Sequence, residues 1–212
     1  MNKIIVILAI LFSCNYVFLE NIYGENPSAQ KPAADSTASS AEYLKLRLDY
    51  SKSPEYNPYS PDVHAIMGEC YRLMNEGKLK EAIEKGKLGL ERDKYNIQLL
   101  IALASAYRKT GDTENADKFR KLWVGLVNSI LTSGDGKSTK AAIKVISVDE
   151  EYAVLEVLNL RRTRQKHVVV DGSNFDVLEV KKEETGIKFD LFFNIDIPFK
   201  WLGQKYGTDK IL

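Results

Sequence analysis

The chain has 212 residues, a hydrophobic fraction of 44%, a charged fraction of 28% and a formal net charge of +1. This length and composition are those of an ordinary globular protein with one compact domain or two small ones. The balanced charge argues against a strongly basic nucleic-acid-binding protein and gives no reason to expect binding to an acidic membrane surface. We therefore expect no nucleic-acid partner.

The first residues have the pattern of a targeting segment. Lys3 supplies a positive charge, and residues 4–12 form an unbroken apolar run. A run of this length is too short to span a bilayer, which takes roughly 20 residues, but it matches the core of a signal peptide. The small residue Gly24 predicts a signal peptide over residues 1–24 and export of the remainder to the periplasm or the medium.

A second interpretation of the same segment stays open. The run Leu11-Phe12-Ser13-Cys14 resembles a bacterial lipoprotein signal, in which Cys14 is acylated and becomes the first residue. Phe12 is bulkier than that motif usually allows. Under this interpretation the protein contacts the membrane only through a lipid on Cys14. Cys14 and Cys70 are the two cysteines, so neither interpretation leaves an internal disulfide.

Folded structure is expected to begin near Ala41. Residues 25–40 contain no aromatic or branched aliphatic side chain. Such a segment buries too little apolar surface to offset its conformational entropy, so we predict a flexible linker. A short helix is expected from Ala41 to Tyr50, and three prolines between residues 54 and 61 then predict an extended connection.

A spacing of 34 residues is the strongest internal signal. The residues that recur at this spacing are Gly77 and Gly111, Ala82 and Ala116, and Cys70 and Ala104. Small side chains let two helices approach closely, and glycine is a common helix terminator. The pattern resembles the tetratricopeptide repeat. We predict tetratricopeptide-like helical hairpins within residues 41–132, with the Cys70 thiol buried and inert.

Residues 133–212 are predicted to form an α+β region packed on these helices. The last helix of the second hairpin is expected over residues 113–131. Further helices are expected from Ser147 through Leu158 and over residues 198–206. Strands are predicted at residues 142–148, 168–170, 175–180 and 187–195, with hairpin turns at Asp171-Gly172 and at residues 183–186. The fold class is therefore α+β, with helical hairpins followed by a small antiparallel sheet and one or two helices.

No group of residues has the spacing of a catalytic or metal site. Residues 134–138 lack the first glycine of a phosphate-binding loop and follow a predicted helix, so they indicate a tight turn. His64 and His167 are not spaced as zinc ligands. The acidic residues 149–151 fit the first turn of a helix. We expect no enzyme activity, no cofactor and no metal.

The densest basic run covers residues 161–167 and is expected on a connection between a helix and a strand. A solvated loop explains the run, and contact with an acidic partner is the functional alternative. The candidate contact residues are Arg161, Arg162, Arg164, Lys166 and His167.

Several stretches together resemble a known family. These are residues 129–138, 145–152 and 193–196, and the run at residues 56–59 agrees with them. The sequence resembles an exported bacterial family called domain of unknown function 4919. Residues 41–206 would form one domain of that family. The resemblance implies export and helical hairpins ahead of an α+β end. That family carries no assigned activity, so no functional residue is transferred.

The leading hypothesis is a non-enzymatic interaction module of the bacterial cell envelope with an unknown envelope protein as partner. The alternative is an enzyme or carrier whose small envelope ligand binds between the helices and the sheet.

Overall fold

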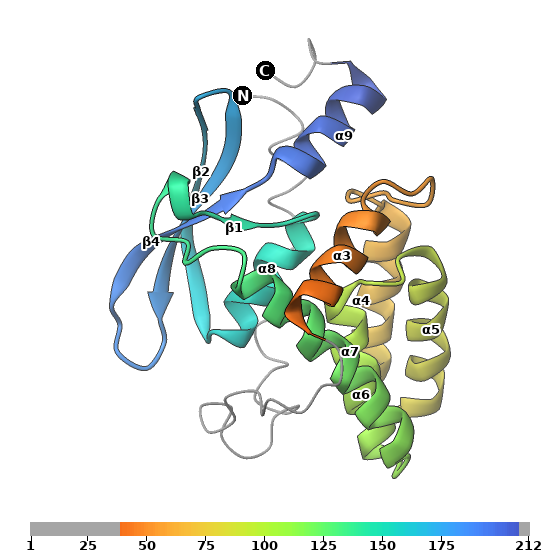
Figure 1. The fold of residues 1–212 in the computed structure, drawn as a ribbon. Helices are drawn as coiled ribbons and strands as arrows, with labels where there is room; N and C mark the ends of the chain where they lie inside the picture. Colours follow the sequence, from red (N-terminus) through yellow and green to blue (C-terminus); the bar gives the residue numbers. More distant parts are fainter. Residues whose placement is uncertain (1–38, 208–212) are drawn as a thin grey trace. The chain divides into compact units, whose positions relative to one another are not determined.

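The computed structural model describes residues 39–207. The chain divides into two units, residues 1–35 and 36–212, and the described residues all lie in the second. The predicted signal segment, Cys14 and nearly all of the predicted linker therefore lie outside the described residues. Helices come first and a small sheet follows (Figure 1), which confirms the predicted α+β class.

The N-terminal half consists of helices that mostly begin at a polar capping residue. Ser39 caps the first of them in a capping box with Glu42, and Asn96 accepts a hydrogen bond from the Leu99 amide at the start of another. No helix within residues 39–207 is long and apolar enough to cross a membrane. The bounds are α3 Ser40–Tyr50, α4 Pro61–Asn75, α5 Leu79–Arg92, α6 Ile97–Lys109 and α7 Thr113–Leu131.

These helices pair as two hairpins, α4 with α5 and α6 with α7. Gly77 and Gly111 follow the first helix of each hairpin with φ of 74° and 84°, in the left-handed region that favours glycine. Ala82 and Ala116 are completely buried where the second helix crosses the first. The residues that recur every 34 positions therefore occupy equivalent places in the two hairpins.

The hairpins differ at Gly86 and Gly89 of α5, which have no glycine counterpart in α7. A Cβ atom built on Gly89 would lie 2.5 Å from Cδ1 of Leu99, and one on Gly86 would lie 2.9 Å from Cδ2 of Leu103. Both glycines therefore permit a close approach of α5 to α6, and this contact explains why two glycines are tolerated inside a helix.

The sheet has four strands in the order β1-β4-β3-β2. Strands β2, β3 and β4 are antiparallel, as predicted, and β1 adds a parallel pair with β4. Asp171 and Gly172 both have positive φ, which is typical of the two-residue hairpin turn that the sequence predicts between β2 and β3. The bounds are β1 Ile143–Lys144, β2 Leu160–Val170, β3 Ser173–Lys182 and β4 Lys188–Asn194.

The strand predicted over residues 142–148 is wrong for most of its length. Only Ile143 and Lys144 pair with β4, because Ser147 caps a new helix directly afterwards: its Oγ accepts a hydrogen bond from the Glu150 amide at 3.3 Å. The remaining elements are the 3-10 helix η2 Thr139–Ala141, α8 Val148–Val157 and α9 Asp196–Tyr206.

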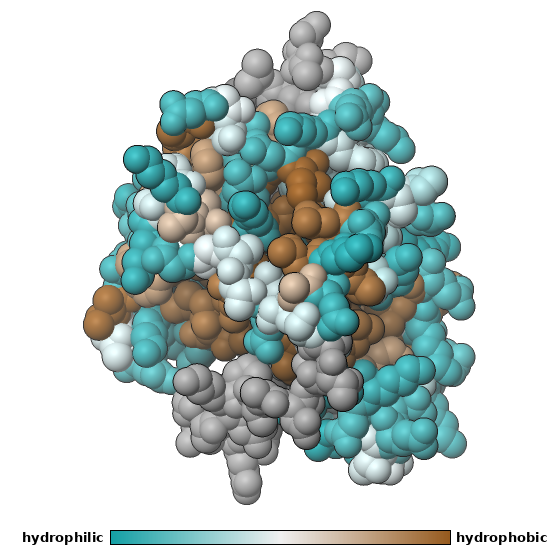
Figure 2. Space-filling model, viewed as in Figure 1, coloured by the Kyte–Doolittle hydropathy of each residue, from teal (hydrophilic) through white to brown (hydrophobic). Residues whose placement is uncertain are grey.

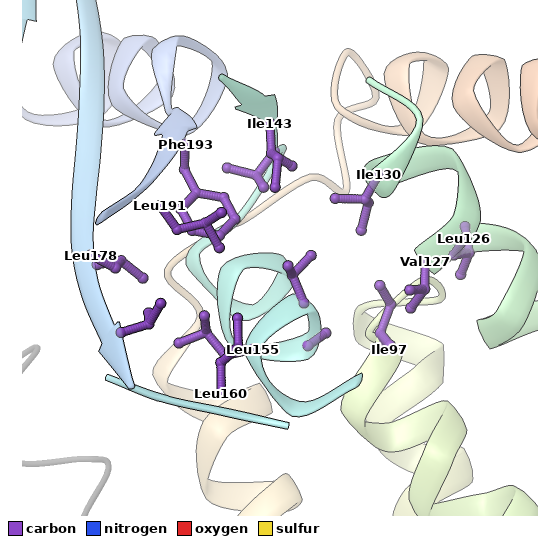
Figure 3. Close-up of a cluster of buried hydrophobic side chains, with 14 of the residues drawn as sticks. Ile97, Leu126, Val127, Ile130, Ile143, Leu155, Leu160, Leu178, Leu191 and Phe193 are labelled. Carbon is purple, nitrogen blue, oxygen red and sulfur yellow. The ribbon is translucent and has the colours of Figure 1, made fainter. Parts of the chain in front are cut away.

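Helix α8 lies between the N-terminal helices and the sheet (Figure 1). Buried side chains from both sides meet around it in one continuous core, which Figure 3 shows in close-up. Ile97 and Leu126 come from the N-terminal helices, Leu155 from α8, and Leu178 and Phe193 from the sheet. The helical half and the α+β half therefore share a core.

Candidate functional site

The three acidic residues at the start of α8 are buried and point in three directions. Because consecutive residues of a helix are about 100° apart around its axis, Asp149, Glu150 and Glu151 meet different parts of the molecule. The sequence predicts their helix and its Ser147 cap correctly. Their burial and their long-range partners are not part of that prediction.

Glu150 forms a two-pronged ion pair with Arg47 of α3. Nε and Nη2 of Arg47 donate to the two carboxylate oxygens at 2.7 and 2.6 Å, and the Arg47 side chain is only 1% exposed. Arg47 also donates to the Ser129 hydroxyl of α7 at 3.3 Å and to the Lys144 carbonyl of β1 at 3.0 Å. This one arginine therefore connects α3, α7, β1 and α8.

Asp149 is held by the helical half. His64 of α4 lies 3.2 Å from Oδ1 of Asp149, and the Asn96 amide donates to Oδ2 at 3.0 Å. The hydrogen bond to Asp149 raises the pKa of His64. Asn96 also donates to Asp93 at 3.2 Å, and burial, together with the nearby Asp149 charge, raises the pKa of Asp93 to about 6.

Glu151 is the least satisfied of the three. Its side chain is completely buried, and neither carboxylate oxygen has a hydrogen-bond partner among residues 39–207. Burial and then the charge of Asp176 on β3 raise the pKa of Glu151 well above the ordinary value, so the fold favours its protonated form. Asp176 accepts a hydrogen bond from Gln165 at 2.8 Å, and burial raises the pKa of Asp176 as well.

Asp93, Asp149, Glu150, Glu151 and Asp176 form an acidic cluster that leaves little room for a ligand. The cavity beside it is lined by Tyr50, Asp93 and Asp149 among others and measures about 10 Å³, which is room for about one water molecule. Within residues 39–207 no three His, Cys, Asp or Glu side chains are placed to hold a metal ion. The arrangement links the N-terminal helices to α8 and β1.

The basic residues 161–167 lie within strand β2, so their predicted position on a connection is wrong. The chain passes from α8 into the strand after Asn159, whose positive φ of 51° makes the turn. β2 is also longer than the predicted strand at residues 168–170, because pairing with β3 continues through the whole basic run apart from an irregularity between Arg162 and Arg164. The run of charged residues lacks the apolar alternation that predicts a strand, so the sequence pattern does not identify this part of β2.

The strand divides the candidate contact residues between its two faces. Arg162 and His167 share the side of the core residues Val180 and Leu178, since Arg162 pairs with Val180 and Gln165 with Leu178. Arg162 lies over the Tyr152 ring and His167 stacks on Phe199. The residues on the opposite face are Arg161, Arg164 and Lys166.

The other chemical candidates from the sequence have structural roles. Cys70 is buried, its Sγ lies 3.3 Å from the Ala82 carbonyl, and burial raises the pKa of the thiol to about 11. A Cβ on Gly134 would collide with the Ala142 carbonyl oxygen, so the segment 134–138 packs closely against the backbone of Ala141 and Ala142. Cys14 lies outside the described residues.

Comparison with known proteins gives one finding. The model of the family described as "Domain of unknown function (DUF4919)" matches residues 30–202. No curated protein and no solved structure matches the chain. The family description states no activity, so function has to be argued from the residues above.

Proposed function

Given that this chain belongs to the DUF4919 family, we propose that it is a non-enzymatic protein-interaction module of the bacterial cell envelope. The observation that carries the proposal is strand β2. Residues 160–170 contain no acidic side chain and four arginines or lysines, and the strand forms one end of the sheet. A cationic surface on a rigid element suits recognition of an acidic partner.

Two features of the sequence support the envelope location. The apolar run at residues 4–12 supports export, and Cys14 offers a lipid anchor as the alternative to cleavage after Gly24. The 34-residue spacing and the paired helices α4–α7 support a tetratricopeptide-like origin for the helical half, an architecture whose stacked hairpins present binding surfaces.

Cross-linking in the native host tests this function. A C-terminally tagged copy is cross-linked in cells and purified, and the recovered proteins are identified by mass spectrometry beside an unrelated tagged exported protein. We expect one dominant envelope protein that is absent from the control. Repeated recovery of the chain alone contradicts the proposal. The same spectra identify the first residue as Glu25 or as lipidated Cys14.

The second candidate is an enzyme or carrier for a small envelope ligand. The carboxyl of Asp93 favours it, because burial raises its pKa to about 6 and it lies beside a small cavity. Small-molecule sites commonly measure about 300–1,000 Å³, and the cavity beside this carboxyl measures about 10 Å³. Thermal-shift screening against envelope metabolites separates the two functions, because only the second predicts a ligand that raises the melting temperature.

A further inference from the structure

Within residues 39–207, strand β2 has a free edge. It is the last strand in the order β1-β4-β3-β2 and pairs with β3 on one side only. With eleven residues and no proline it is also the longest strand of the described chain. A terminal strand leaves half of its backbone N–H and C=O groups without a partner strand, and such an edge can accept an added strand.

The side chains along this edge set the charge of what can bind. Arg161 pairs with Glu183 and Lys166 with Asp190, while Arg164 forms no salt bridge within residues 39–207. The Arg161 and Lys166 side chains are 42% and 62% exposed, and exposed ion pairs of this kind contribute little to stability. Arg161 and Lys166 can therefore exchange partners. An incoming strand with acidic side chains therefore meets weakly held positive charge.

The end of the same strand is apolar. Val169 and Val170 are 56% and 38% exposed beside the β2–β3 turn. Figure 2 shows mostly hydrophilic residues over the visible surface, with smaller apolar areas among them. An added strand therefore has to carry acidic residues along one part and apolar residues along the other.

A second copy of this chain is a poor occupant. Antiparallel pairing of β2 with β2 would place arginines and lysines of one copy beside those of the other, and like charges on neighbouring strands are destabilising. The irregularity between Arg162 and Arg164 adds a second obstacle, since bulges and edge lysines are devices that discourage self-pairing. The repulsion of like charges disappears for an acidic strand of a different protein, which then has only the irregularity to accommodate.

We infer that an extended, acidic segment of a partner protein adds to β2 as a fifth strand, with glutamate or aspartate beside residues 161–166 and apolar side chains beside Val169 and Val170. This inference rests on the proposed function and names the chemistry of the partner. Backbone hydrogen bonds along the free edge hold the segment, and the charge pattern selects it.

A labelled synthetic peptide tests the inference on the full-length protein by fluorescence anisotropy. The probe is Val-Thr-Val-Thr-Glu-Thr-Glu-Thr-Glu-Thr, whose order suits antiparallel addition. One control peptide carries lysine in place of each glutamate, and another has alternate backbone amides methylated. We expect binding of the first peptide alone, weakening as salt is added. Equal binding of the lysine peptide or of the methylated peptide overturns the inference, and so does no binding at millimolar concentration.

A pair of variants locates the contact. Arg164→Thr with Lys166→Thr removes two positive charges from β2 while keeping residues that favour strands, and should weaken the peptide about tenfold. Lys137→Thr with Lys140→Thr removes the same charge before β1 and should leave the affinity unchanged. Circular dichroism shows whether each variant is folded. Equal affinity of both folded variants contradicts the inference.

Cross-linking in cells separates this inference from the proposed function. If the Arg164→Thr/Lys166→Thr chain still recovers the wild-type partner in full, the interaction module stands and strand addition to β2 falls. If no version of the chain recovers a partner, the proposed function itself falls.

Discussion

The side chain with the most far-reaching contacts is Arg47. Its guanidinium is buried, its pairing with Glu150 is bidentate, and its other hydrogen bonds reach two further elements. A buried ion pair adds little to stability compared with a well-packed apolar pair, but it is costly to break, since the remaining charge stays buried. Arg47 therefore fixes how α3 packs.

Arg47→Met should lower the free energy of unfolding by about 3–5 kcal/mol, because it leaves the Glu150 carboxylate buried with the Ile146 amide as its remaining donor. Urea denaturation measures the loss. Arg47→Met with Glu150→Gln should recover part of it, since the buried charge is gone and an acceptor for Ile146 remains. Lys45→Met on the same helix breaks an exposed pair with Asp49 and should leave the urea midpoint nearly unchanged. A double variant no more stable than Arg47→Met would contradict this account.

Glu151 gives the protein an unusual pH dependence. Around it lie Asp149 and Glu150 on α8, Asp176 on β3 and Arg162 on β2. Its charge also contributes to the raised pKa of Tyr59 and Tyr152. The folded state raises the pKa of Glu151, Asp176 and His64, that of Asp93 to about 6 and that of Glu156 to about 7. Each of these groups binds its proton more tightly in the folded state, so its contribution to stability is present below its unfolded-state pKa and is lost as pH rises through its folded-state pKa.

We expect the free energy of unfolding to decrease between pH 5 and pH 8. Glu151→Gln keeps the size of the side chain but carries no charge, so its stability should fall less steeply and exceed that of the wild type at pH 8. Each unit of pKa elevation corresponds to about 1.4 kcal/mol. Denaturation at both pH values gives the slope. Glu114→Gln, an exposed residue of α7, should leave the slope unchanged, and a Glu151→Gln slope equal to the wild type would refute the assignment.

Two glycines inside helices of the helical half differ in how closely neighbouring atoms pack against them. A methyl group added to Gly68 of α4 would meet no atom within 4 Å, whereas one added to Gly89 of α5 would press on Leu99 and Ile66. Gly68→Ala should therefore stabilise the protein by about 0.5–1 kcal/mol, since alanine favours helices. Gly89→Ala should destabilise it through crowding, by about 1–3 kcal/mol. Thermal unfolding of the two variants gives the signs, and equal shifts in the same direction would show that the α5–α6 contact is not tight.

The sequence predicts well those elements whose signals are local. The start of α7 at Thr113, the turn at Asp171 and Gly172, and the terminating glycines of both hairpins follow from residue preferences and spacing. Strand β2 is recognised only in part, because arginine and lysine have no strand signature and its pairing is decided by β3. The acidic cluster is missed, since nothing local links Arg47 to Glu150. In the sequence, the cluster is indicated only by Arg47, which stands between Leu46 and Leu48 in α3.

The whole molecule joins its two halves through α8 and a shared core, so they should unfold together. Trp123 lies in α7 and Trp201 in α9. Trp201→Phe leaves a fluorescent probe in the helical half, and Trp123→Phe leaves one in the α+β half. We expect both variants to show a fluorescence midpoint in urea that coincides with their own loss of circular dichroism. Separate midpoints would mean that residues 41–132 and 133–207 are independent domains.

The span of the Arg47–Glu150 pair also determines when folding can finish. The two residues are 103 positions apart. β1 cannot pair until β4 has been made, because Ile143 of β1 pairs with Phe193 of β4. During synthesis the hairpins α4–α5 and α6–α7 close on neighbouring segments, but Arg47 has no charge partner until α8 has been made. A growing chain that has reached residue 140 therefore has Arg47 without its carboxylate and an apolar face of α6 and α7 that α8 and the sheet do not yet cover. Transiently exposed apolar surface of this kind is what makes partly made chains prone to aggregate.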